Sequence, residues 1–153
     1  MAYQIQRAQK VCETLELLDA DGNIAAHISV NLDVDKTAME FNKRYNAVIV
    51  AEKAVHDADI AALGETVRMT QEQADTANTA FTVFGTAILD LFAIVFGAEN
   101  TQTLLAFFDG NYYEMSMQVV PFLMNVVLPS MKEHLQAQRI QMAENYKVAQ
   151  RKT

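Results

Sequence analysis

Residues 78–96 read NTAFTVFGTAILDLFAIVF, and apolar side chains recur through them at spacings of three and four residues, the period of an α-helix. One face comprises Phe81, Phe84, Ile88, Leu91, Phe92 and Val95, and it is widened by Val83, Leu89 and Phe96. A helix that is apolar most of the way round is enclosed by other elements. Because polar residues interrupt the run, we expect a buried core helix and not a membrane span.

Turn and cap signals follow this helix. Gly97 is placed to end it, because glycine accepts the left-handed backbone of a C-terminal cap. Asn100 can cap a short helix over 101–108, and the Asp-Gly pair at 109–110 breaks that helix. Asn111 is a favourable N-cap for the last helix. The sequence therefore predicts three helices in succession after residue 78.

The last helix changes character along its length. Residues 115–131 are apolar on two sides, and Pro121 and Pro129 lack the N–H of a helix interior, so we expect a bend. Residues 132–153 keep only a thin apolar stripe, which consists of Leu135, Met142 and Tyr146. Such a stripe cannot bury itself well in a monomer. We therefore expect a globular domain over 1–131 and a projecting helical extension over 132–153 that meets a partner or another copy.

A β-hairpin is predicted upstream, over residues 11–32. Its arms at 14–18 and Ile24–Leu32 flank the turn sequence DADGN, in which Asp-Gly tolerates positive φ. Apolar residues on one face of the second arm are Ile24, Ala26, Ile28, Val30 and Leu32. A lone hairpin is marginal in water, so this one must pack on helices. The predicted fold is mainly α (α+β): an N-terminal β-hairpin followed by a helical bundle with a long C-terminal helix.

A further helix follows the hairpin. Thr37 and Glu40 match a capping box. The apolar stripe beyond them consists of Phe41, Tyr45, Val48 and Val55. Gly64 weakens the helix, and residues 70–73 (TQEQ) supply a second start signal. Residues 36–76 therefore form either two helices or one long rod, and the sequence does not decide between them.

The charge is acidic and uneven, with a net value of −7. Residues 54–131 hold nine acids and one Arg, whereas residues 132–153 hold five bases against two acids. Nucleic-acid binding requires a dense basic face, so we expect no nucleic-acid partner. Cys12 is the only cysteine, which rules out an intrachain disulfide and suits a reducing compartment. The N-terminus lacks the apolar region of a signal peptide.

No residue pattern predicts catalysis, a cofactor or a metal. His56 and Asp59 can share a helix face, but two ligands fall short of the three or four of a zinc site. Residues 19–23 alternate like the start of a calcium loop, yet the glycine and the closing Glu of such a loop are not in place. Cys12 has no histidine nearby in the sequence to act as its base. The sequence therefore predicts a non-enzymatic protein that binds other proteins.

Three turn and cap motifs lie downstream of residue 84. They are FGAEN at 96–100, FDGNYYEM at 108–115, and VVPF at 119–122 followed by VVLP at 126–129. Together with FNKRYN at 41–46, they resemble motifs of the small tail proteins of long-tailed phages and prophages of Gram-positive bacteria, described as tail assembly chaperones. The resemblance covers residues 36–131 and excludes the extension.

This resemblance implies a role in tail morphogenesis with no catalysis and no cofactor. Proteins of this kind bind the tape-measure protein, keep its long apolar helices soluble and hand over tail-tube subunits. The implied partners are tail proteins and further copies of the chain, with no membrane, and the implied location is the host bacterial cytoplasm. The alternative is a minor tail or connector protein that stays in the virion.

The candidate partner-binding surface lies on the last helix and its extension. Its residues are Met115, Val119, Phe122, Met124, Met131, Leu135, Met142 and Tyr146. Methionine suits adaptable groove-type surfaces, although filling gaps in a core is its commoner use.

Overall fold

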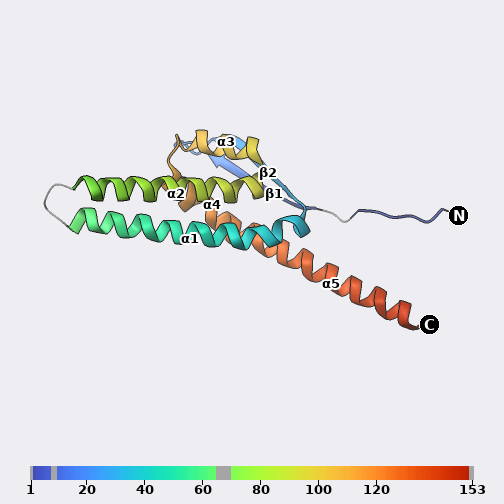
Figure 1. Cartoon of the computed structure of the whole chain (residues 1–153). Helices are drawn as coiled ribbons and strands as arrows, with labels where there is room; N and C mark the ends of the chain where they lie inside the picture. The colour runs from blue at the N-terminus through green and yellow to red at the C-terminus, as the bar shows by residue number, and fades with distance from the viewer. Residues whose placement is uncertain (1, 8–9, 65–69, 152–153) are drawn as a thin grey trace.

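An antiparallel hairpin opens the chain, and helices make up the remaining regular structure of the described residues (Figure 1). The computed structural model describes residues 2–7, 10–64 and 70–151. The predicted mainly α fold, with its N-terminal β-hairpin and long C-terminal helix, is confirmed. The elements are β1 (Val11–Leu18), β2 (Ile24–Leu32), α1 (Val34–Gly64), α2 (Gln71–Phe96), α3 (Ala98–Phe107), α4 (Tyr112–Phe122), the π-helical turn η1 (Leu123–Val127) and α5 (Leu128–Arg151).

The hairpin packs one face on the helices, as its alternating pattern predicts. Strand β2 buries Ile28, Val30 and Leu32, while the residues between them are exposed. The Asp19 carboxylate closes the turn by accepting hydrogen bonds from two backbone N–H groups within it, both at 2.9 Å. Gly22 has a φ of 84°, which is the positive φ that Asp-Gly turns require.

Helix α1 begins before the predicted capping box. The helix starts at Val34, so Thr37 lies inside its first turns, and its hydroxyl donates to the Asp33 carbonyl at 2.9 Å. The prediction that Thr37 and Glu40 cap this helix is therefore wrong. The predicted apolar stripe is confirmed by the buried side chains of Phe41, Val48 and Val55.

Residues 36–76, for which the sequence allows two helices or one long rod, contain two helices in their described part. Thr70 has an extended backbone, and its hydroxyl accepts the Gln73 N–H at 3.1 Å. The Gln73 side chain accepts the Thr70 N–H at 3.0 Å, which completes a capping box. Helix α2 therefore starts afresh after Thr70, and residues 65–69 lie outside the described part.

Helix α2 is the centre of the fold. It packs against α1, β2, α3 and α4, and it buries Ala80, Phe84, Gly85, Ala87, Ile88, Leu91, Phe92, Val95 and Phe96. Among the described residues it is also the one helix long and apolar enough to cross a membrane by length and composition. Phe81 and Val83, which the sequence places in the core, are 44% and 53% exposed. The first half of α2 has α1 beside it but lies beyond the hairpin and α3 (Figure 1).

The last helix runs through α4, η1 and α5 and buries every fourth residue. These residues are Met115, Val119, Leu123, Val127 and Met131. In a regular α-helix a four-residue step overshoots a full turn by about 40°, so four such steps would turn the stripe away from the core.

The π-turn η1 takes up one extra residue and thereby brings the stripe back to the core. The Leu128 N–H donates to the Leu123 carbonyl, five residues back. Pro121 precedes this turn and Pro129 follows it. The bend expected from the prolines stays a prediction, and the irregularity that the structure shows between them is a π-turn.

Candidate functional site

Metal-binding chemistry finds no support in the described residues, where no three His, Cys, Asp or Glu side chains gather. The Asp59 side chain, which would pair with His56, lies outside the described side chains. The calcium-like sequence at 19–23 forms the hairpin turn, with its first carboxylate bonded to the turn's own backbone.

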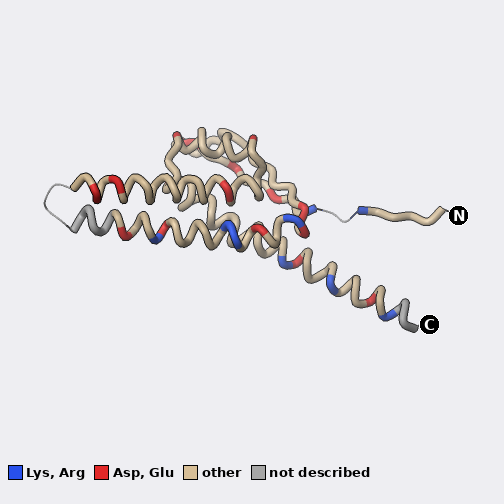
Figure 2. Tube along the Cα trace, viewed as in Figure 1, with Lys and Arg blue, Asp and Glu red and all other residues tan. Residues whose placement is uncertain are grey.

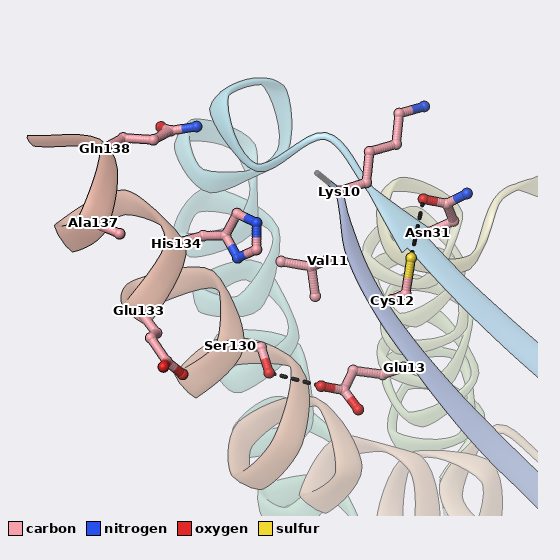
Figure 3. Close-up of a pocket in the computed structure, with 10 residues that line it drawn as sticks. All are labelled: Lys10, Val11, Cys12, Glu13, Asn31, Ser130, Glu133, His134, Ala137 and Gln138. Atoms are coloured by element: carbon pink, nitrogen blue, oxygen red, sulfur yellow. Dashed lines mark hydrogen bonds between the residues drawn. The ribbon is translucent and has the colours of Figure 1, made fainter. Parts of the chain in front are cut away.

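A groove of about 910 Å³ lies between the start of β1 and α5 (Figure 3). Both strands and α5 line it, through Lys10, Val11, Cys12, Glu13, Asn31, Ser130, Glu133, His134, Ala137 and Gln138. A cysteine and a histidine both line it, so it is the first candidate for chemistry.

The groove does not assemble a nucleophile with its base. Cys12 points to Asn31, with 3.7 Å between its Sγ and Oδ1, whereas His134 lies on the other side of β1 (Figure 3). This separation follows from strand geometry, because successive side chains point to opposite faces. On the helix side, the Ser130 hydroxyl donates to a Glu13 carboxylate oxygen at 2.8 Å. The residues that line the groove therefore attach α5 to the sheet.

The predicted partner-binding residues divide into three groups by burial. Met115, Val119 and Met131 are buried in this chain's own core. Phe122, Met124 and Leu135 are partly buried against that core. Met142 and Tyr146 are 59% and 64% exposed. The predicted surface is corrected accordingly, because a side chain enclosed by its own domain cannot meet a partner.

Residues 132–151 form the arm, which leaves the body on the side opposite to the end of α1 and the start of α2 (Figure 1). His134, Leu135 and Gln138 still touch the body, and every side chain from 139 to 147 is exposed. Ile140 joins Met142 and Tyr146 as an exposed apolar residue that the sequence reading did not include.

A second exposed apolar surface lies between α1 and the first half of α2. It is a shallow groove of about 650 Å³ lined by Ala54, Glu72, Asp75, Thr76, Thr79, Ala80 and Val83, here called the tip groove. Sequence periodicity could not locate it, because the apolar pattern of α2 does not say which part of the helix lacks a neighbour.

The arm and the tip groove differ in the sign of their charge. Residues 70–131 contain no Lys or Arg, so the acids along α2, α3 and α4 have no basic neighbour on their own helices (Figure 2). The arm carries basic residues along its length, among them Lys132, Arg139 and Lys147 (Figure 2). The molecule therefore has an acidic body and a basic arm.

The FGAEN motif shapes the turn from α2 to α3. Gly97 has φ 84° and ψ 164°, a conformation essentially restricted to glycine. The Asn100 amide donates to the carbonyls of Phe96 and Ser29, at 3.1 and 3.3 Å. Because α3 already begins at Ala98, the prediction that Asn100 caps this helix is wrong; it holds the end of α2 to strand β2 instead.

The FDGNYYEM motif shapes the turn from α3 to α4. Asp109 and Gly110 both have positive φ, at 53° and 75°. The Asn111 side chain accepts the Glu114 N–H at 3.0 Å, so the predicted cap of the last helix is confirmed. Both motifs therefore direct the backbone and present no reactive group.

No protein-family model matches this chain, and no curated protein or solved structure was found to be similar to it. The candidate site is accordingly defined by the chain's own geometry. It consists of two exposed apolar surfaces, the basic arm and the acidic tip groove.

Proposed function

We propose that this protein is a non-enzymatic phage tail morphogenesis factor, an assembly chaperone that binds the tape-measure protein, tail-tube subunits or both. The observation that carries the proposal is the arm. Its apolar residues Ile140, Met142 and Tyr146 are exposed on a stretch of helix that the described part of the body does not cover. The resemblance of residues 36–131 to small phage tail proteins supplies the class of client.

The physical requirements of such a role match what the chain offers. A long helical client presents apolar stripes, and helices with apolar anchors at spacings of three, four and seven residues bind such stripes. On the arm, the apolar residues Leu135, Met142 and Tyr146 lie seven and four residues apart. The net charge of −7 keeps a complex with an apolar client in solution.

Co-purification with fragments of the tape-measure protein from the same genome tests the proposal. We expect the tagged full-length chain to capture helical fragments of this client. The double substitution Met142→Glu and Tyr146→Glu should abolish capture, because it places charge on the arm's apolar stripe. The matched control is Met39→Glu, at a position on α1 that is 84% exposed, and it should leave capture unchanged.

Failure of the wild-type chain to capture any tape-measure or tail-tube fragment would contradict the proposal. Mass spectrometry of finished particles then separates a chaperone from a structural tail component. A chaperone is absent from the particle, whereas a minor tail or connector protein is present in a fixed ratio.

A further inference from the structure

The arm has the chemistry of a basic amphipathic helix. Arg139 lies one turn before Met142, and Met142 lies one turn before Tyr146, so a cation and two apolar groups share a face. Lys147 follows on the adjoining face below Ile140. Glu144 is the one acid between residues 139 and 151, so the segment is net basic.

The tip groove has the complementary chemistry. Its floor consists of small side chains, Ala54 and Ala80 with Val83, which allow a helix to approach closely. Its wall on α2 carries Glu72 and Asp75. On the adjoining exposed stretch of α1, the acids Glu52 and Asp57 outnumber Lys53.

The dimensions of the two surfaces also agree. From Glu72 to Val83 the groove follows about 17 Å of α2, at a rise of about 1.5 Å per residue. The helix of the arm from residue 139 to its end at Arg151 is about 18 Å long by the same rise. A third helix laid there would complete a three-helix packing around the α1–α2 pair.

The arm cannot reach the tip groove of its own chain. His134 and Gln138 lie beside Val34 at the start of α1, whereas Ala54 is about 30 Å further along that helix. The arm then points away from the groove (Figure 1). An arm that fits the groove must therefore come from another molecule.

We propose that the arm of one copy docks in the tip groove of a second copy, with Met142 and Tyr146 on the groove floor and Arg139 and Lys147 facing Glu72 and Asp75. This contact extends the protein-binding role proposed for the arm, and it requires no tape-measure protein. It uses two different surfaces, so a copy that offers its arm keeps its own groove available.

Sedimentation equilibrium of the purified full-length chain, without any client, tests the contact. We expect the average mass to grow with concentration from the low micromolar range to about 1 mM, and to fall at high salt. Reversing the charges of the arm with the double substitution Arg139→Glu and Lys147→Glu should weaken association at least about tenfold. Reversing the groove, Glu72→Lys with Asp75→Lys, should do the same. A mixture of these two variants should regain association, because the acidic arm of the first variant meets the basic groove of the second, and the basic arm of the second meets the acidic groove of the first.

The chain that carries all four reversals restores the complementary signs and should regain association. A chain that stays monomeric at every concentration overturns the proposal, as does a quadruple variant that folds, by its circular dichroism, but does not associate. Variants of the arm alone do not distinguish this contact from a symmetric arm-to-arm dimer, because both contacts use the arm. The quadruple variant distinguishes them, because reversing the groove restores association only if the arm binds the groove.

A cysteine pair gives a second readout that does not depend on charge. In a Cys12→Ser background, Val83→Cys chains mixed with Met142→Cys chains should form a disulfide-linked dimer under mild oxidation. The control replaces Met142→Cys by Met117→Cys, which is equally exposed at 61% but lies on α4, and it should not cross-link. Equal cross-linking of both pairs overturns the docking. If association fails while tape-measure capture succeeds, only this inference falls; the reverse result leaves it standing without the proposed client.

Discussion

The two halves of the last helix are both helical but have opposite surroundings. Residues 112–131 bury every fourth side chain in the core, whereas in the arm no side chain from 139 to 147 is buried. Helix propensity does not explain this difference, because it favours the arm over residues 112–131, which contain two prolines and four valines. The difference lies in the width of the apolar surface. Two apolar sides produce burial within the chain, and a thin stripe leaves a helix that depends on a partner.

Deleting single residues from the buried half of the last helix should have the largest effect on the fold. Deleting the exposed Gln118 in α4 rotates the rest of the last helix by about 100° about its axis, so its buried stripe no longer faces the core. We therefore expect this deletion to abolish the folded state. Loss of the exposed Asn125 removes the extra residue of the π-turn and leaves a regular helix with the same stripe. Circular dichroism and thermal melting compare the two. Equal damage from both deletions would contradict the role assigned to the π-turn.

Truncating one methionine in each half measures the difference in burial directly. Met115→Ala removes a fully buried side chain and should lower the free energy of unfolding by about 2–5 kcal/mol. Met142→Ala, at an exposed position, should change it by less than about 0.5 kcal/mol. Urea denaturation at low protein concentration gives both values. A large loss at Met142 in a monomeric sample would show that the arm folds back on its own body.

Close packing at the start of the buried half is tested at Gly85. A Cβ added there would lie 2.9 to 3.2 Å from three ring atoms of Tyr112, so the ring would have to shift. We expect Gly85→Ala to destabilise the fold by about 1–2 kcal/mol. In a Tyr112→Ala background the clash is absent, and the same substitution should stabilise by up to about 1 kcal/mol through helix propensity. Additive effects in this double-mutant cycle would contradict the contact.

The boundary between the halves is held by the hydrogen bond from Ser130 to Glu13. Ser130→Ala should cost about 1 kcal/mol, because the partly buried Glu13 carboxylate loses its donor. In a Glu13→Ala background, Ser130→Ala should lower the free energy of unfolding by less than it does in the wild-type chain. Chemical denaturation of the four proteins gives the coupling, and a coupling of zero would remove this bond as an anchor of the arm.

Periodicity and turn chemistry predicted most of the fold. The Asp-Gly turn and the alternation in β2 placed the hairpin, and apolar spacing placed the core helices. Helix starts were less secure, because Thr37 and Asn100 have cap-forming side chains but the helices begin earlier. The π-turn was not predicted, since a four-residue spacing of apolar residues does not reveal how the backbone absorbs it.

The candidate site was predicted only in part, because exposure depends on which neighbours cover a helix. Met115, Val119 and Met131 match the pattern of a binding stripe as well as Met142 does, yet the body encloses them. Phe81 and Val83 look like core residues in sequence, yet they are exposed, and they belong to the first half of α2, which extends beyond the hairpin and α3 (Figure 1). Local pattern identifies apolar surfaces, and only the tertiary arrangement shows which of them remain open.

The placement of the arm and the tip groove at opposite ends of the α1–α2 pair gives any assembly built from them a direction. A row of such molecules has one terminus with a vacant groove and one with a vacant arm. The row closes only if its rotation returns to the first molecule, and the smallest closed case is two copies that exchange arms about a two-fold axis. Where it does not close, its length is decided by something outside the chain, and an extended helical client alongside the row can act as the ruler.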